Sequence, residues 1–250
     1  MRLAGKVAMV TGGGAGIGRA IVLAMAREGA DALIPDIQTA NAEAVAKEVQ
    51  DLGRRAKVVR TDVTKEAEIV AAIADGIRAF GQIDVLVNNA GVIPALGHPF
   101  TRQVEADWDK VFNVNLKSVF FTCKHIAAHF MERRYGKIIN ISSIAARKAA
   151  RGMGIYCIAK AGLEMLTKVL AVELASDHIQ VNAVAPCVVR TQFSQPFWSN
   201  DSILQEILKT IPSGRIAEPD DVVGAVLFLA SNLSDFITGE ILDVDGGSMA

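Results

Sequence analysis

Short apolar segments alternate with longer segments of helical periodicity along almost the whole chain, and this alternation restricts the fold more than any other feature. The apolar segments lack the polar alternation of a strand with one face in water, so each is expected to be buried on both faces. The predicted strands are residues 7–10, 32–34, 57–60, 83–87, 137–141, 179–184 and 241–244. The predicted helices are residues 17–26, 40–52, 66–80, 155–175 and 220–230, with a long helical region over 104–131 that we expect to break near 113–115.

This order of elements predicts a parallel sheet covered by helices on both faces. Right-handed crossovers then give a doubly wound, Rossmann-type α/β sheet of seven parallel strands, with ligands at the carboxyl ends of the strands. A (β/α)8 barrel is the alternative, but the chain has seven strands and a glycine-rich first loop, which favour the open sheet. No repeat or low-complexity linker divides the sequence, so one domain is expected over residues 1–250.

Composition excludes several classes of function. Lys and Arg number 26 against 27 Asp and Glu, so net charge gives no reason to expect a nucleic acid or an anionic membrane as partner. The apolar runs are too short to span a bilayer, and the first residues do not resemble a signal peptide. The three cysteines form no CxxC pair, which argues against a disulfide framework or a zinc site. We expect a cytoplasmic protein without a bound metal.

The loop between the first strand and the first helix is dominated by glycine, which occupies five of the seven positions 12–18. The strict GxGxxG pattern does not fit; the spacing is instead Gly12, Gly16 and Gly18, with Ile17 beginning the helix. Glycine lets a pyrophosphate approach the backbone, and the helix N-terminus offers free N–H groups. A tight turn without a ligand needs only one or two glycines, so the loop predicts a dinucleotide site.

Asp36 follows the second strand, 18 residues after Gly18. A carboxylate there can accept hydrogen bonds from the adenosine ribose and would repel a 2′-phosphate. No Lys or Arg stands at positions 13–15 or 37–38, so the sequence favours NAD over NADP. An ordinary turn aspartate is the alternative, and Pro35, which removes a ladder hydrogen bond, could tilt the carboxylate.

Polar residues follow the third and fourth strands at the same edge of the predicted sheet. Asp62 and Val63 come after the third strand, and Asn88-Asn89-Ala90-Gly91 after the fourth. We expect these segments to contact the cofactor, with the two amides holding backbone and ribose. Asp62 is equally consistent with capping the next helix, and the Asn-Asn-Ala-Gly segment with a simple turn.

Residues suited to proton transfer occur further along the chain. Tyr156 and Lys160 are four apart at the start of a predicted helix and therefore share one face. Ser143 ends the fifth strand, and Asn115 lies at the expected helix break. The YxxxK pattern alone is common by chance, but its combination with the glycine loop, Asn-Asn-Ala-Gly and Ile-Ser-Ser is not.

Together these residues resemble the short-chain dehydrogenase/reductase family over essentially the whole chain. The resemblance implies a catalytic tetrad of Asn115, Ser143, Tyr156 and Lys160, with the nicotinamide beside Tyr156 and held also by Lys160. It implies further cofactor contacts from Ala90, Gly91, Pro186, Val189 and Thr191, and a homotetramer packed partly through residues 239–247. One departure is Cys187, which stands where the family usually has glycine; its side chain could crowd the nicotinamide or shape the substrate wall.

The size of one effect supports this mechanism. A tyrosine with a pKa of about 10 must lose its proton near pH 7, which costs roughly 4 kcal/mol. An ammonium about 4 Å away supplies roughly 4 kcal/mol at an effective dielectric constant near 20. We therefore predict that Lys160 lowers the pKa of Tyr156, that Ser143 binds the substrate oxygen and that Asn115 anchors a water molecule.

Three other groups of residues have a functional and a structural interpretation. His125 and His129 have the spacing of a helical metal pair but no evident third ligand, which favours surface or interface histidines. Arg147, Lys148 and Arg151 could bind an acidic substrate group, although a solvated loop is the simpler interpretation. Residues 190–215 correspond to the family's substrate lid, and their aromatic residues, Phe193, Phe197 and Trp198, suit an apolar wall or plain packing.

The function that fits best is an NAD-dependent oxidoreductase that interconverts a secondary alcohol and a ketone. Its expected partner is a small-molecule alcohol or ketone. A 3-oxoacyl-[acyl-carrier-protein] reductase is the alternative within the same fold, and Asp36 argues against it. A catalytically silent dinucleotide-binding sensor or scaffold is the alternative from another class, and the intact tetrad argues against that.

Overall fold

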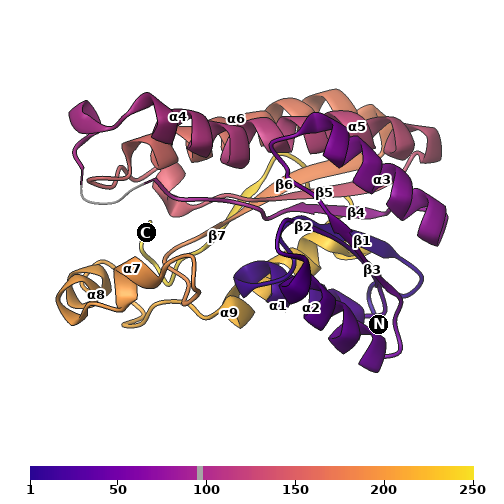
Figure 1. The fold of residues 1–250 in the computed structure, drawn as a ribbon, viewed down its shortest axis with the longest axis horizontal. Coiled ribbons are helices and arrows are strands. Elements are labelled where there is room, and N and C mark those ends of the chain that lie inside the picture. The colour runs from indigo at the N-terminus through magenta and orange to yellow at the C-terminus, as the bar shows by residue number, and fades with distance from the viewer. Residues whose placement is uncertain (95–97) are drawn as a thin grey trace.

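The seven predicted apolar segments form the seven strands of one parallel sheet in the computed structural model, which describes residues 1–94 and 98–250. Their order across the sheet is β3-β2-β1-β4-β5-β6-β7, and Figure 1 labels each strand. The strands are β1 (Val7–Val10), β2 (Asp31–Asp36), β3 (Ala56–Arg60), β4 (Val85–Asn88), β5 (Gly136–Ile141), β6 (Ile179–Pro186) and β7 (Ile241–Val244). The predicted doubly wound α/β fold is therefore confirmed.

Helices cover both faces of this sheet (Figure 1). One layer contains α1 (Gly16–Arg27), α2 (Thr39–Asp51) and α9 (Pro219–Ala230), and the other contains α3 (Glu66–Phe80), α4 (Glu105–Phe112), α5 (Ser118–Arg133) and α6 (Gly154–Leu174). Each layer buries its own apolar cluster against the strands. Two short helices, α7 (Gln195–Trp198) and α8 (Asp201–Leu208), lie at the lower left of Figure 1 within the segment expected as the lid.

The direction of chain winding reverses between β1 and β4. The chain builds outward from β1 through β2 to β3, then returns to place β4 on the other side of β1. Loops at the carboxyl ends of β1 and β4 consequently diverge around a crevice, which is where open α/β sheets bind ligands. The fold places the glycine loop and the Asn-Asn-Ala-Gly segment at this position.

Strand β2 is longer than the predicted 32–34 and contains Pro35. Pairing with β1 reaches only as far as Leu33, whereas pairing with β3 continues to Asp36. A proline is tolerated here because its missing N–H falls where the ladder with β1 has ended. The Pro35 carbonyl still accepts a 2.9 Å hydrogen bond from the Gly12 N–H, so the residue connects the strand to the glycine loop.

The long helical region breaks at the predicted place through a π-helical turn. Residues Asn113–Lys117 form this turn between α4 and α5, and the backbone remains helical through both of its ends. A π turn holds one residue more than an α turn and changes which side chains face inward. It brings Asn115, which is 1% exposed, into the interior near the end of β4.

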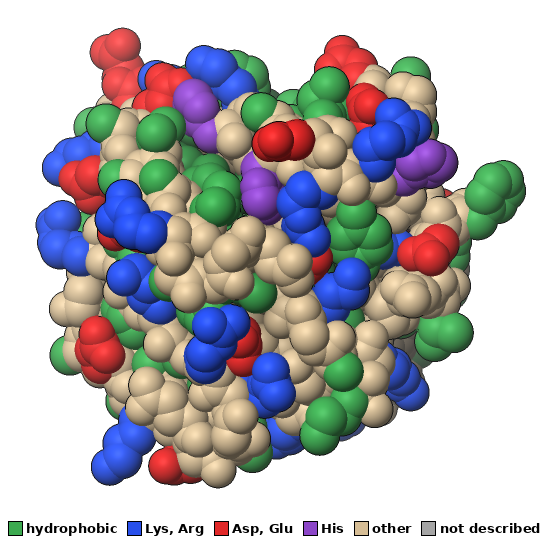
Figure 2. All heavy atoms as spheres, turned by 90° about the vertical axis from the view of Figure 1, so that its right-hand side faces the viewer, with side chains coloured by type: hydrophobic (Ala, Val, Ile, Leu, Met, Phe, Trp, Pro, Cys, Tyr) green, Lys and Arg blue, Asp and Glu red, His purple; other side chains and the backbone are tan. Residues whose placement is uncertain are grey.

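The amino ends of the strands are held by ion pairs. The buried Asp84 carboxylate, just before β4, accepts hydrogen bonds from the Val7 N–H and from Arg133 at 2.8 Å each. Figure 2 views the molecule from the side opposite α7 and α8, and Lys and Arg side chains lie there beside Asp and Glu. In the described part of the chain, no helix combines the length and the apolar character that crossing a membrane requires.

Candidate active site

The glycine loop brings the backbone of β1 and α1 into close contact. A Cβ at Gly18 would lie 2.2 Å from the Gly12 carbonyl oxygen and 2.5 Å from the Asn89 Nδ2. Gly12 and Gly16 have φ angles of +64° and +52°, where a side chain would add strain. The helix begins at Gly16 without a side-chain cap, so its first N–H groups remain free to bind an anion.

Asn89 and Thr11 fix this loop against β4. The Asn89 Nδ2 donates to the Thr11 and Gly12 carbonyls, both at 3.0 Å, and the Thr11 Oγ1 accepts from the Asn89 and Ala90 N–H groups. The Asn88 side chain points away from the loop, into a buried chain with Asn140. Of the two amides expected to hold backbone and ribose, Asn89 therefore holds the backbone of the loop, whereas Asn88 bonds to Asn140 in β5. Sequence reasoning missed Thr11, because a hydroxyl before glycines carries no distinctive signal.

Asp36 lies at the carboxyl end of β2 and faces the glycine loop. Its Oδ2 accepts from the Gly14 N–H at 2.9 Å and its Oδ1 from the Gln38 N–H at 2.8 Å. The carboxylate is thus oriented by two backbone amides, and Pro35 leaves it close to the cofactor crevice. The next residue, Ile37, is 56% exposed and carries no charge.

The Asp62 side chain forms hydrogen bonds within the turn that follows β3. Its Oδ1 accepts hydrogen bonds from the Thr64 Oγ1 at 2.7 Å and the Thr64 N–H at 3.0 Å. The hydroxyl of Thr64 is the main cause that lowers the pKa of this carboxyl. The turn precedes α3, whose N-cap residue is Lys65 and has no side-chain cap. The Asp62 carboxylate therefore stabilises the turn and does not cap the helix, and Val63 follows in the same turn.

Asn115 connects the π-helical turn to the loop after β4. Its side chain donates to the Val92 carbonyl and accepts from the Val92 N–H, each at 2.8 Å. A Cβ at Gly91 would lie 3.5 Å from the Asn115 Oδ1. The side chain therefore holds the Ala90–Val92 backbone beside the crevice.

Ser143 follows β5 and starts a 3-10 turn, Ile144–Ala146. Its Oγ accepts from the Ala145 N–H at 3.2 Å. Hydrogen bonding with Ser143 is also the interaction that acts to lower the pKa of Tyr156, so the two hydroxyl groups lie near each other.

Tyr156 and Lys160 occupy one buried face of α6. The Lys160 Nζ lies 5.7 Å from the centre of the Tyr156 ring and donates to the Ile141 carbonyl at 2.7 Å. Burial raises the pKa of Tyr156 to about 12 and lowers the pKa of Lys160 to about 8. The predicted lowering of the tyrosine pKa by this lysine is therefore wrong for the chain itself. Removing the phenolate from water outweighs the attraction of an ammonium that is aimed at a carbonyl.

The segment after β6 lies over the other side of the crevice. Pro186 ends β6 opposite Val244, Val189 bridges to Ala217, and the methyl of Thr191 would lie 3.2 Å from a Cβ at Gly16. The Thr191 Oγ1 lies 3.3 Å from the Ser194 Oγ. Cys187 packs with the cluster under α9, and burial raises the pKa of its thiol, so it contributes to packing on that side.

Aromatic residues of the expected lid approach the tyrosine. The Phe193 ring lies 6.5 Å from the Tyr156 ring and remains 43% exposed. Trp198 is held to the backbone, because its Nε1 donates to the Thr191 carbonyl at 3.2 Å, and Arg190 lies over its ring. Phe193 is therefore the aromatic residue of this segment whose ring lies beside the Tyr156 ring.

Several charged residues that sequence reasoning weighed have partners elsewhere. Arg147 pairs with Glu164 and Asp243, and Lys148 donates to the Ser248 carbonyl at 3.2 Å, which supports the simpler interpretation for both. His125 contacts Glu66, and His129 accepts from the Ile83 N–H at 3.1 Å. Among residues 1–94 and 98–250, no three His, Cys, Asp or Glu side chains are grouped as metal ligands would be.

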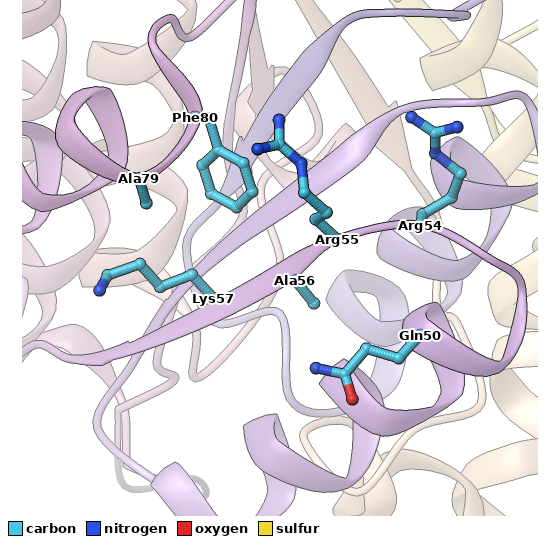
Figure 3. Close-up of a pocket in the computed structure, with 7 residues that line it drawn as sticks. All are labelled: Gln50, Arg54, Arg55, Ala56, Lys57, Ala79 and Phe80. Atoms are coloured by element: carbon cyan, nitrogen blue, oxygen red, sulfur yellow. The ribbon is translucent and has the colours of Figure 1, made fainter.

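A hollow of about 450 Å³ lies at the amino end of β3, away from these residues (Figure 3). Arg54, Arg55 and Lys57 line it, with Arg55 placed 5.0 Å from the centre of the Phe80 ring. Both arginines bond to the buried Asp31. The ion pair with Asp31 accounts for the two arginines, and this hollow lies apart from the crevice at the carboxyl ends of the strands.

The fold and the site together define an oxidoreductase class. A crevice suited to a dinucleotide lies beside a half-buried serine and a buried Tyr-Lys pair, which are suited to proton transfer. A family model described as "Enoyl-(Acyl carrier protein) reductase" matches residues 12–249. The chain belongs to the short-chain dehydrogenase/reductase family, whose members bind NAD or NADP and act on CH–OH groups.

Individual relatives span the full chain. A 3-oxoacyl-[acyl-carrier-protein] reductase of Thermotoga maritima is 38% identical over 99% of both chains. The 5-keto-D-gluconate 5-reductase of Escherichia coli K12 is 36% identical over 99% of this chain and 96% of its own. A candidate gluconate 5-dehydrogenase of Beutenbergia cavernae, solved with NADP at low occupancy, is 35% identical with a TM-score of 0.93 over 99% and 98% of the two chains.

Proposed function

We propose that this chain interconverts a secondary alcohol and a ketone with NAD(H), using Asn115, Ser143, Tyr156 and Lys160. The observation that carries the proposal is the pair of hydroxyl groups of the half-buried Ser143 and the buried Tyr156, beside the buried Lys160 ammonium. Ser143 lies just after the carboxyl end of β5, and Tyr156 and Lys160 lie in the first turns of α6, next to the dinucleotide crevice. A silent scaffold would not need this arrangement.

The residues present fit a dinucleotide. The backbone of residues 12–18 is packed so closely that a Cβ at Gly18 would clash with the Gly12 carbonyl, and free N–H groups at the start of α1 suit the pyrophosphate of the dinucleotide. Asp36, Val63, Ala90 and Gly91 would line the adenosine half, and Pro186, Val189 and Thr191 the nicotinamide half. The bound nicotinamide would donate or accept the hydride.

The chain's own residues handle the proton. Ser143 would hydrogen-bond the substrate oxygen while negative charge develops there. Tyr156 is protonated at neutral pH, because burial raises its pKa to about 12, so it stands ready to donate a proton to a ketone oxygen. Lys160, with a pKa of about 8, keeps its charge at neutral pH and would stabilise the phenolate that results. Asn115 holds the loop beside this group and would anchor a water molecule for proton exchange.

The substitution Tyr156→Phe tests the proposal. It removes the proton donor and keeps the ring, so turnover should fall roughly 100-fold or more while NADH binding, followed by fluorescence titration, stays unchanged. A panel of 5-keto-D-gluconate, acetoacetyl-CoA and simple cyclic ketones provides the substrates. Activity retained by the Phe variant would contradict the assignment of the proton donor.

NAD is the cofactor that Asp36 favours. A carboxylate held by the Gly14 and Gln38 N–H groups accepts ribose hydroxyls and repels a 2′-phosphate. The NADP in the Beutenbergia relative favours the other cofactor for that protein. We expect kcat/KM to be about tenfold higher with NADH than with NADPH, and Asp36→Ala to narrow the difference. A preference for NADPH in the unaltered enzyme would reverse this assignment.

The proposed substrate is a small alcohol or ketone whose apolar part packs against the Phe193 ring. We propose that residues 190–215 form a lid, since Phe193 faces Tyr156 from this segment. A 3-oxoacyl-carrier substrate is the second candidate, because the Thermotoga relative bears that name. Faster reduction of acetoacetyl-CoA than of the sugar acid or cyclic ketones would favour it.

A homotetramer is the assembly we propose. The exposed sides of α5 and α6 carry large apolar residues, including Phe120, Met165 and Val172, the last 82% exposed. Contiguous exposed apolar surface on adjacent helices is typical of subunit interfaces. Sedimentation velocity distinguishes a tetramer from a monomer, and a monomer would contradict the proposal.

A further inference from the structure

Three functional-looking side chains share one face of α6 at intervals of four residues: Tyr156, Lys160 and Glu164. All three are buried, with Lys160 5% and Glu164 7% exposed. Residues at this spacing lie one above the other on a helix. The first two belong to the proposed proton-transfer group, whereas Glu164 has no role in it.

Glu164 contacts both ends of the segment that carries Ser143. Its Oε1 accepts from the Ser142 Oγ at 3.2 Å, and its Oε2 lies 3.2 Å from the Arg147 Nε. One turn earlier on α6, the Lys160 Nζ donates to the Ile141 carbonyl. The helix therefore holds residues 141–147 at three points, with Ser143 between them.

The segment itself is tied down on its other sides. The Ser142 N–H donates to the Val184 carbonyl in β6 at 2.7 Å, and Arg147 also pairs with Asp243 in β7. Within the segment, the Ala146 N–H donates to the Ser143 carbonyl at 2.9 Å. The Glu164 carboxylate thus connects α6 to a turn that is held on its other sides. A shift of this carboxylate would therefore shift Ser143 relative to Tyr156.

We propose that Glu164 is a positioning residue, whose two carboxylate oxygens fix the segment from Ser142 to Arg147 on α6 and thereby set the placement of Ser143 against Tyr156. This inference rests on the proposed function, because it assigns a role through the Ser143–Tyr156 pair. A buried carboxylate is costly unless each oxygen is paired, and here each oxygen has a partner at a different end of one short segment.

Glu164→Gln tests this role, since it keeps the shape of the side chain and removes its charge. Misplacement of a reacting group by a fraction of an ångström slows the chemical step, so we expect kcat for the best ketone of the panel to fall about tenfold. KM should change less than about twofold, because the Ser143 hydrogen bond strengthens mainly as charge develops in the transition state, and the NADH dissociation constant should change as little, because Ser143 is not assigned to the cofactor. The isotope effect on kcat with 4-deuterated NADH should rise.

A spectroscopic readout makes the test independent of turnover. The chain has two tyrosines, and the hydroxyl of Tyr135 is buried without a hydrogen-bond partner, so Tyr135→Phe leaves Tyr156 as the sole tyrosine at little cost. In this background, the Tyr156 Cζ resonance in ¹³C-labelled protein should move on Glu164→Gln. It should not move on Glu173→Gln, the matched change at an exposed site of the same helix.

The outcomes separate the two proposals. A lower melting temperature with unchanged kcat and an unchanged Tyr156 resonance would show that Glu164 is only structural and would overturn the inference. If Glu164→Gln does not fold, Ser142→Ala removes one of the two contacts, and it should still lower kcat about threefold and move the resonance; no effect on either would overturn the inference as well. Activity retained by Tyr156→Phe would instead overturn the proposed function.

Discussion

The two halves of the crevice are held in place by different means. On the nucleotide side, backbone contacts fix the loop: Gly12, Gly16 and Gly18 allow close approach, and Asn89 bonds directly to two of its carbonyls. On the chemical side, charged side chains connect elements that are far apart in sequence, as when Arg147 joins Glu164 in α6 to Asp243 in β7. The first half tolerates little added volume, whereas the second depends on charge.

The largest effect is expected from a substitution that disrupts the glycine loop on the nucleotide side. Gly18→Ala would place a Cβ 2.2 Å from the Gly12 carbonyl, and backbone cannot yield as a flexible side chain can. We expect the NADH dissociation constant to rise about 100-fold and the free energy of unfolding to fall by about 3 kcal/mol.

Gly224→Ala is the matched control for that change. A Cβ at Gly224, in α9, meets nothing within 4 Å, and alanine favours helix. The variant should bind NADH normally and unfold at a slightly higher temperature. Equal loss of NADH binding in both variants would show that the close approach at Gly18 is unimportant.

A smaller expected effect, on the pH dependence of catalysis, tests whether the chemical half depends on charge. Lys160 has a pKa lowered to about 8 by burial, so its ammonium is lost as the pH rises through that value. The kcat/KM for ketone reduction should therefore be level below pH 8 and fall by up to about tenfold per pH unit above it.

Lys160→Arg provides the comparison, because an arginine stays charged throughout this range. Whatever activity it retains should lack the alkaline fall near pH 8. A profile that keeps the same fall in the arginine variant would assign it to another group.

The smallest effect concerns a polar contact outside both halves. His129 accepts from the Ile83 N–H, and burial, with Arg133 nearby, lowers its pKa below the ordinary 6.5. The unfolded chain takes up a proton below pH 6.5 while the folded chain resists it, so stability falls as the pH decreases below that value. We expect about 1 kcal/mol to depend on this contact.

Urea titrations at pH 7.5 and 5.5 measure that dependence. In His129→Gln, whose amide oxygen can accept without titrating, the pH-dependent loss should be smaller. An identical loss in both proteins would show that other groups cause it.

The contrast between the halves also explains what the sequence could predict. The strands, their parallel order and the glycine loop follow from local patterns, since the identities of neighbouring residues determine which segments are buried and where the backbone is flexible. The pairing of Glu164 with Arg147, and the use of Asn89 and Thr11 within the loop, depend on contacts between distant segments. The pKa of Tyr156 was mispredicted for the same reason, because burial of the ring and the direction of the Lys160 side chain are tertiary properties.

The single π-helical turn at residues 113–117 has a consequence for the tolerance of this region to length changes. Each residue of a regular helix advances the chain by roughly 100° around its axis. Because a π turn holds one residue more than an α turn, deleting one residue there would restore ordinary helix with α4 and α5 close to their present orientation, but it would take Asn115 off the Val92 backbone. The region should accept many substitutions of its outward-facing residues but not a one-codon deletion.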